Sequence, residues 1–292
     1  MKVFGRIIKG IGGFYYVHDG KTVYECKARG IFRNISRKPL PGDIVEIETF
    51  SDGCANITDI CERKSELIRP ACANAEKALL FFAVKDPEPD FLLIDKLTIY
   101  YKSRGLSVIP VFNKSDLASA ETFGSIEKMY RGTGFRPIFI SVKNRVNIDL
   151  AKDMIKGGLT VISGPSGAGK SSFINLISPE ADMMTGEISE KLGRGRHTTR
   201  HSQLFHVGDE TYIMDTPGFT AFELPGIKPA ELKDYYPEFE LYESKCRFPD
   251  CVHIGERDCA VKDAVSDGEL SRVRYENYRL LYNDTIKANK YV

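Results

Sequence analysis

Short apolar runs separated by polar turns divide the chain into three regions. Residues 1 to about 67 contain segments rich in Val, Ile, Tyr and Phe that are punctuated by Gly and Asp: VFGRIIKG, GFYYVHDG, TVYECKARG and DIVEIETF. Several short strands within fewer than 70 residues predict a small β-barrel. Two interpretations stay open for this region, a barrel that binds nucleic acid and a small sandwich without a binding role.

A different alternation covers residues 68 to about 224. The apolar runs AEKALLFFAV, SVIPVF, RPIFIS, LTVIS and TYIMD are separated mostly by helix-length amphipathic stretches such as PDFLLIDKLTIYYKSRG and DLASAETFGSIEKMYRG. This pattern predicts an α/β domain with crossover helices and a largely parallel sheet. We therefore expect a ligand at the carboxyl ends of the strands.

The last region, residues 225 to 292, combines three cysteines with a helical tail, SDGELSRVRYENYRLLYNDTIKAN. Ser266, Asp267 and Gly268 are candidates for capping the start of that helix. The three regions give the predicted domains 1–67, 68–224 and 225–292.

Composition narrows the class of protein. The 292 residues are 42% hydrophobic and 28% charged with a net charge of +1, which excludes a mainly disordered chain and a wholly basic nucleic-acid coat but allows a local basic face. We expect no membrane span, because no apolar run reaches about 18 residues. The start of the chain lacks the pattern of a signal peptide. Seven cysteines, an odd number, favour a reducing cytoplasm.

The strongest single signal is LTVISGPSGAGKSSFINLI, in which an apolar strand leads through a glycine-rich loop into a helix over about Lys170 to Ile177. The loop matches GxxxxGK[ST] in the strand–loop–helix setting that this motif requires. Its backbone N–H groups can point at phosphate oxygens, Lys170 supplies a positive charge, and the Ser171 hydroxyl is a magnesium ligand. The predicted phosphate-binding residues are Gly164, Pro165, Ser166, Gly167, Ala168, Gly169, Lys170, Ser171 and Ser172.

Two further strand ends indicate that the base is guanine. SVIPVFNKSDL places the NKxD residues Asn113, Lys114 and Asp116 after an apolar strand. The two carboxylate oxygens of Asp116 can accept hydrogen bonds from guanine N1–H and N2–H₂, donors that adenine lacks. We expect Asn113 to bond the O6 side of the base or neighbouring loops, and the stem of Lys114 to cover the ring. One strand later, a Ser-Ala-Lys-like element would support O6 through a backbone N–H; its residues are Ser141, Val142 and Lys143.

Two segments that follow the phosphate loop are candidate switches. In YIMDTPGF, Asp215 can hold magnesium through water and the Gly218 N–H can bond the γ-phosphate. The basic stretch GEISEKLGRGRHTTRHSQLF offers Thr198 and Thr199 for the second magnesium contact, with Thr199 slightly preferred. The alternative for this stretch is a solvated basic loop. Because the base-recognition elements precede the phosphate loop, the order of motifs indicates a circularly permuted GTPase.

The C-terminal cysteines form a candidate metal site together with a histidine. Cys246, Cys251, His253 and Cys259 offer three thiolates and one imidazole within 14 residues. This donor set suits tetrahedral zinc and disfavours magnesium or calcium. Because all four positions would be filled by protein, the zinc would be structural. The alternative is a set of reduced cysteines in a polar loop.

Taken together, the barrel, NKSD, SVK, GPSGAGKSS, GRHTT, DTPGF and the Cys-Cys-His-Cys tail resemble the RsgA/YjeQ family of small-ribosomal-subunit biogenesis GTPases. The resemblance implies an OB-fold, a circularly permuted GTPase domain and a zinc domain. It also implies GTP hydrolysis with Mg²⁺ that is stimulated by the small ribosomal subunit during its late maturation. The implied partners are that subunit and its rRNA, and the implied form is a monomer in a bacterial cytoplasm.

The sequence indicates less directly which residue positions the attacking water. Many GTPases orient the attacking water with a Gln after DxxG, but this chain has Phe219 there. We therefore expect slow intrinsic hydrolysis. His197 in GRHTT is the candidate for positioning water, a role that the resemblance also suggests. The alternatives are that His197 contacts RNA or packs the loop, and that the chain is an RNA-binding assembly factor using GTP as a structural ligand. A P-loop kinase is disfavoured by NKSD and DTPG.

Overall fold

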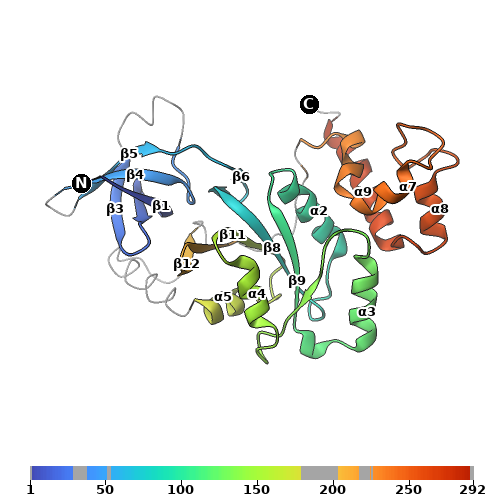
Figure 1. Ribbon diagram of the computed structural model, residues 1–292, viewed down its shortest axis with the longest axis horizontal. Helices are drawn as coiled ribbons and strands as arrows, with labels where there is room; N and C mark the ends of the chain where they lie inside the picture. Colours follow the sequence, from blue (N-terminus) through green and yellow to red (C-terminus); the bar gives the residue numbers. More distant parts are fainter. Residues whose placement is uncertain are drawn as a thin grey trace.

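The computed structural model describes residues 2–28, 38–50, 54–178, 203–216, 224 and 226–289. Figure 1 shows that the α/β part of the chain lies in the centre, with the N-terminal strands on one side and the C-terminal helices on the other. The predicted fold class is confirmed by this arrangement. The exact domain limits at residues 67 and 224 stay predictions.

The N-terminal region is a closed barrel with the strand order β1-β2-β3-β5-β4. Its strands are β1 (Lys2–Ile11), β2 (Phe14–His18), β3 (Val23–Ala28), β4 (Ile44–Thr49) and β5 (Ala55–Ile60). The parallel pairing of β3 with β5 closes an otherwise antiparallel sheet. Apolar side chains that alternate along the strands fill the interior, among them Ile7, Val17 and Ile57, which expose no surface. A closed barrel excludes the two-sheet sandwich.

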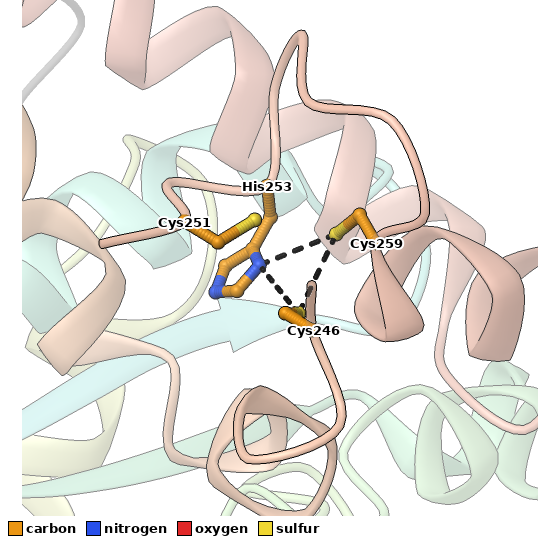
Figure 2. Close-up of side chains that lie close together, drawn as sticks. All are labelled: Cys246, Cys251, His253 and Cys259. Atoms are coloured by element: carbon orange, nitrogen blue, oxygen red, sulfur yellow. Dashed lines mark hydrogen bonds between the residues drawn. The ribbon is translucent and has the colours of Figure 1, made fainter. Parts of the chain in front are cut away.

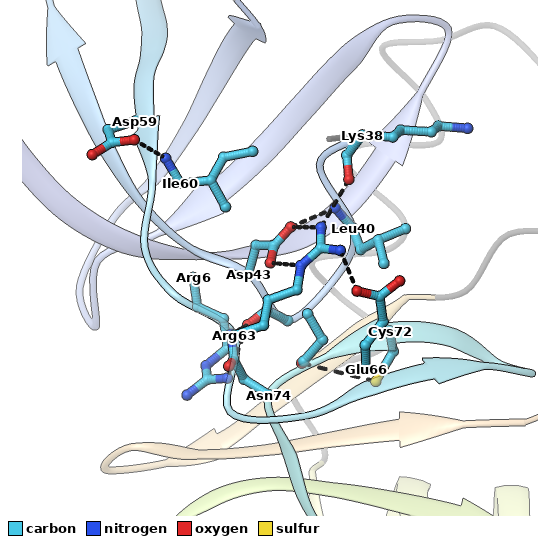
Figure 3. A network of polar contacts seen from close by, with 12 residues as sticks. Arg6, Lys38, Leu40, Asp43, Asp59, Ile60, Arg63, Glu66, Cys72 and Asn74 are labelled. Carbon is cyan, nitrogen blue, oxygen red and sulfur yellow. Dashed lines mark hydrogen bonds and ion pairs between the residues drawn. The ribbon is translucent and has the colours of Figure 1, made fainter. Parts of the chain in front are cut away.

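An ion pair to a buried carboxylate lies at the point where the chain leaves the barrel. The Arg63 guanidinium donates to both carboxylate oxygens of Asp43 at 2.7 Å, and Asp43 is fully buried (Figure 3). The same guanidinium reaches Glu66 at the start of β6 (Glu66–Ile68), which pairs with β7 (Ala71–Ala73). Such a bidentate pair constrains orientation as well as distance. The barrel is therefore held in a defined direction at its junction with the central domain.

The central domain contains a sheet of six strands in the described part of the chain, in the order β10-β9-β8-β11-β13-β12. The strands are β8 (Ala75–Ala83), β9 (Ser107–Asn113), β10 (Ile138–Phe139), β11 (Gly158–Ser163), β12 (Leu204–Gly208) and β13 (Thr211–Asp215). All pairs are parallel except the β12–β13 hairpin, whose turn lies at Gly208 and Asp209 as the sequence indicates. Parallel pairing brings the carboxyl ends of β8, β9, β11 and β13 to one edge of the sheet.

Helices cover both faces of this sheet. The elements are α2 (Phe91–Lys102), η1 (Ser115–Leu117), α3 (Ala120–Met129), α4 (Ile148–Ile155) and α5 (Lys170–Ile177). Buried residues of α2 and α3 share one hydrophobic core with the C-terminal region. Buried residues of α4 and α5 form a separate core with the opposite face of the sheet. Within the residues that the structure describes, the C-terminal region therefore packs on the α2–α3 side of the sheet.

The C-terminal region is helical around the cysteine cluster. It contains η2 (Pro229–Tyr235), η3 (Pro237–Phe239), α7 (Glu240–Glu243), α8 (Ala260–Ser266) and α9 (Arg272–Asn289). The expectation that residues 266 to 268 cap the last helix is wrong, because α8 ends at Ser266. Ser271 takes this place, since its hydroxyl accepts a hydrogen bond from the backbone N–H of Arg274 at 3.4 Å.

A buried charge network joins this region to the central domain. Arg274 of α9 donates to Glu238 of η3 and to Asp95 of α2, each at 2.5 Å, and all three side chains are about 3% exposed. Asn277 also donates to Asp95 at 2.8 Å. Burial raises the pKa of Asp95, and the Arg274 charge acts against this shift. Breaking such a network by removing one partner would leave an uncompensated buried charge.

Among the helices in the described ranges, none combines the length and the apolar character needed to cross a membrane.

Candidate nucleotide-binding site and metal centre

The predicted phosphate-binding loop connects β11 to α5 at the carboxyl edge of the sheet. A Cβ atom on Gly164 would lie 1.9 Å from the backbone oxygen of Phe81, and one on Gly169, which has φ +97°, would lie 2.3 Å from the Asn113 amide nitrogen. Only glycine fits at these two positions. The helix begins at Lys170, as the sequence predicts, so that the loop and the N-terminus of α5 can face an anion together.

Lys170 and Asp215 place opposite charges at this loop. The Lys170 ammonium donates to the backbone oxygens of Gly164 and Pro165, both at 2.8 Å. Burial lowers the pKa of Lys170, and Asp215 partly offsets this effect. Burial raises the pKa of Asp215, against the influence of Lys170 and of the Thr216 backbone N–H. The Oδ1 atom of Asp215 is buried without a hydrogen-bond partner, which fits a carboxylate that faces a cation such as Mg²⁺.

Asn113 lies at the end of β9 and joins the loops expected to hold the phosphates and the base. Its side-chain nitrogen donates to the backbone oxygen of Ala168 at 2.8 Å, and its oxygen accepts from the backbone N–H of Val142 at 3.0 Å. Asn113 is buried, so its contact with Ala168 is shielded from water, while the contact with Val142 is partly buried. Of the two predicted roles of Asn113, the structure contains the one toward neighbouring loops.

Asp116 is exposed, and its carboxylate is held in place from one side. The Ser141 hydroxyl donates to its Oδ1 atom at 2.5 Å, and this hydrogen bond is the main cause of the lowered pKa of Asp116. The charges of Lys114 and Lys143 act in the same direction. The carboxylate therefore stays ionised and keeps a second oxygen for a ligand. Sequence reasoning grouped Ser141 with the base-binding residues but did not assign it this positioning contact.

A segment that sequence reasoning missed lies beside both loops. Residues 85 to 90 follow β8, and the Lys114 ammonium donates to the backbone oxygen of Asp86. A Cβ atom on Gly167 would lie 3.6 Å from Pro87, so the segment runs next to the phosphate loop. Asp90 then caps α2 by accepting from the Leu93 backbone N–H at 2.9 Å. The rule that ligands bind at the carboxyl ends of parallel strands could have identified it, because β8 ends there.

The remaining predicted site residues are either exposed in the phosphate loop and the first turn of α5 or lie outside the described residues. Ser166, Ser171 and Ser172 are exposed, with Ser171 and Ser172 in the first turn of α5. His197, Thr198, Thr199 and Gly218 lie outside the described residues, so their predicted roles remain predictions. Thr216, next to Asp215, donates to the backbone oxygen of Ile162 at 2.9 Å and thereby attaches the end of β13 to β11.

The structure brings the four predicted metal ligands together (Figure 2). The ligand atoms of Cys246, Cys251, His253 and Cys259 all lie within 4.8 Å of one another. The Cys246 and Cys259 sulfurs are 3.9 Å apart, and His253 Nδ1 lies 3.4 Å from the Cys259 sulfur. Zinc–sulfur bonds of about 2.3 Å in a tetrahedron separate two sulfurs by about 3.8 Å. The arrangement therefore fits a closed, structural zinc site.

Glu243 supports this site from outside the ligand set. Its carboxylate lies 3.2 Å from His253 Nε2, on the side of the ring opposite the thiols. A hydrogen bond from Nε2–H to this carboxylate fixes the tautomer in which Nδ1 can bind a metal. Glu243 comes from α7, ten residues before His253, and sequence reasoning did not select it. Burial raises the pKa of Cys251 to about 12, so binding a cation there must displace the thiol proton.

Comparison with known proteins places these features in a family. Residues 60–225 match the family model of the RsgA GTPase, and residues 4–57 match that of the RsgA N-terminal domain. The chain belongs to the RsgA family. It is 45% identical over 300 residues to the small ribosomal subunit biogenesis GTPase RsgA of Agathobacter rectalis, covering 98% of this chain and 99% of that protein. It is 44% identical over 287 residues to the RsgA of Clostridium beijerinckii, with 98% of both chains covered.

Solved structures agree with this assignment to the RsgA family. The chain is similar to the crystal structure of YloQ, a circularly permuted GTPase, with TM-score 0.79, 32% identity and coverage of 99% of this chain and 96% of that one. It is also similar to YjeQ from Thermotoga maritima, with TM-score 0.80, 32% identity and coverage of 98% and 99%. The protein is therefore a circularly permuted GTPase, a GTP hydrolase of a family that acts in ribosome biogenesis.

Proposed function

We propose that the protein hydrolyses GTP when it docks on the small ribosomal subunit late in the maturation of that subunit, and that hydrolysis favours its release. A bacterial cytoplasm, where ribosomes are assembled, is the proposed location, and a monomer bound to rRNA is the proposed form. The observation that carries the nucleotide part is the Asn113 side chain, which joins Ala168 of the phosphate loop to Val142 of the base loop. One preorganised site can then hold both ends of GTP.

In this proposal, separate groups of residues bind the phosphates, the guanine and Mg²⁺. The backbone N–H groups of residues 164 to 172 and the Lys170 ammonium hold the phosphates. Asp116, fixed by Ser141, accepts hydrogen bonds from guanine. Ser171 and Asp215 hold Mg²⁺, which neutralises charge on the phosphates when bound. The buried, unpartnered oxygen of Asp215 supports this role.

His197 is proposed to position the attacking water, because Phe219 cannot hydrogen-bond to it. A positioning group of this kind contributes about 10³-fold or more to phosphoryl transfer when a partner completes the site. Thr198 and Thr199 are proposed to complete the magnesium contacts, and Gly218 to contact the γ-phosphate. The zinc site is proposed to stabilise the small C-terminal core, with Cys246, Cys251, His253 and Cys259 as its ligands.

GTP hydrolysis with and without purified small ribosomal subunits tests the proposal. We expect strong stimulation with GTP and none with ATP. The His197→Ala variant should bind GTP and the subunit as the wild type does but lose most of the stimulated rate. Wild-type hydrolysis that the subunit leaves unchanged would contradict the proposed partner. A wild-type rate in His197→Ala would contradict only the catalytic role.

A further inference from the structure

A basic cleft lies on the α3 side of the central domain, and its lining contains none of the residues assigned to the nucleotide and metal sites. It is open, has a volume of about 840 Å³, and is formed by the end of α3 and the loop that leads to β10. Its charged lining residues are Lys128, Arg131 and Arg136, opposed by Glu127 alone. All three cations are exposed, and none takes part in an ion pair within the described ranges.

The cleft has exposed backbone along its walls and a buried side chain at its floor. A Cβ atom on Gly124 or Gly134 would meet no other atom within 4 Å, so a ligand can approach the backbone there. Phe135 is half-buried, and the Lys102 ammonium lies 4.5 Å from the centre of its ring, which adds a fourth cation at this wall. At the base, Tyr130 is buried beneath the guanidinium of Arg274. A ligand would therefore meet a positive surface on a rigid support.

The chemistry of this lining favours a phosphate chain over a protein partner. Arginine guanidinium groups form two parallel hydrogen bonds with a phosphate, and two arginines face this cleft. A stable protein interface needs a buried aromatic or aliphatic centre, whereas the one half-buried ring here is covered by a lysine. Three unpaired cations in an open cleft instead match the spaced negative charges of a nucleic-acid backbone.

We infer that this cleft docks the phosphate backbone of RNA, and that it forms a contact separate from those of the barrel and the metal centre. The source of the RNA rests on the proposed function, which places the protein on the small ribosomal subunit. The cleft shares the α2–α3 side of the sheet with the C-terminal region, and a Cβ atom on Gly132 would lie 3.5 Å from Glu238 of η3. RNA bound there would therefore run along the boundary between the central and C-terminal domains.

The test compares two double variants with the same change in charge. Arg131→Gln/Arg136→Gln removes two cations from the cleft. Lys152→Gln/Lys156→Gln removes two exposed cations from the opposite side of the sheet, in α4 and at its end. Affinity for purified small ribosomal subunits is measured between 0.05 and 0.2 M salt, together with GTP hydrolysis by the free protein.

We expect the cleft variant to bind the subunit roughly 10-fold more weakly near 0.15 M salt and to reduce the slope of log affinity against log salt by about 1.5. The control variant should bind as the wild type does, and both should hydrolyse GTP at the basal rate. Equal affinities of the cleft variant and the wild type, or an equal loss in the control, would overturn the inference. Wild-type protein that does not bind the subunit would instead refute the proposed function.

A cross-linking experiment separates RNA from protein. A photoreactive p-benzoylphenylalanine is placed at position 128 of the full chain, at the rim of the cleft, and irradiated on the subunit. We expect the cross-link to reach rRNA nucleotides. A cross-link to a ribosomal protein without any to rRNA would overturn the inference, because the occupant of the cleft would then be an acidic protein surface.

Discussion

Replacing Arg274 by Met tests the network that joins the C-terminal region to the central domain. The guanidinium donates to Asp95 and Glu238 at 2.5 Å each, and its centre lies 4.8 Å from the ring centre of Tyr236. Without it, two carboxylates remain buried close together. Two such groups can share one proton, so one of them must be neutralised. Protonating a carboxyl with an ordinary pKa near 4 at pH 7 costs about 4 kcal/mol.

This estimate also predicts a dependence on pH. Folded Arg274→Met would bind one proton that the unfolded chain releases above about pH 4, so its stability should fall as the pH rises. The loss relative to the wild type should be about 4 kcal/mol at pH 7 and about 1.4 kcal/mol at pH 5, since each pH unit contributes about 1.4 kcal/mol. Burial already raises the pKa of Asp95 in the wild type, and the variant is expected to raise it further.

Urea unfolding followed by tyrosine fluorescence is a suitable assay, because the chain has 14 Tyr and no Trp. Tyr236 and Tyr278 are buried in this region and report on it directly. The matched control is Arg279→Met on the same helix, whose exposed pair with Glu276 should contribute less than about 1 kcal/mol. A loss below about 1 kcal/mol in Arg274→Met, or a loss that does not change between pH 5 and 7, would refute the reasoning.

Three further predictions concern the base, the metal and the barrel. Asp116→Asn should weaken GTP binding by about 100-fold or more, because guanine loses its paired acceptor, while ATP binding stays weak; titration with labelled nucleotides checks both. Glu243→Ala should lower zinc affinity about 10-fold and Glu243→Gln less, since only Gln keeps an acceptor for His253, as competition with a chromogenic chelator would show. His18 has a pKa lowered by burial and by His206, so its contribution to stability is present above about pH 6.5 and is lost as the pH falls through the lower folded-state pKa. The protection factors for hydrogen exchange in β2 and β13, which are corrected for the intrinsic rate at each pH, should therefore fall below that pH, and His18→Gln should remove the effect.

Local patterns predicted much of the fold and of the nucleotide site. The loop and helix bounds around Lys170 follow from a contiguous motif, and the alternation of the barrel strands is visible in each strand alone. The residues that were missed act over long distances in the sequence. Arg274 lies in a polar tail, and its partner Asp95 is 179 residues away. Nothing in the charge pattern of either segment indicates that the two side chains are buried together.

The same limit explains two smaller differences. The start of α9 was expected near Ser266, because Ser, Asp and Gly together resemble a cap. The structure uses them to end α8, which is decided by packing and not by composition. Glu243 belongs to a four-residue helix whose sequence matches no motif. Its role as a hydrogen-bond partner arises only when the fold brings His253 beside it.

In the proposed binding mode, the Asn113 bridge also determines which part of the site can distinguish GTP from GDP. The bridge fixes the base loop to the phosphate loop, and the two nucleotides share the base and the first two phosphates, so this part of the site must accept both. In the proposed binding mode, the third phosphate would lie toward the end of β13, where Asp215 has its unpartnered oxygen. Three residues earlier on that strand, the Tyr212 hydroxyl lies 2.8 Å from His18 of the barrel. The proposed γ-phosphate position at Asp215 is therefore separated from the barrel contact at Tyr212 by about 10 Å along a single strand.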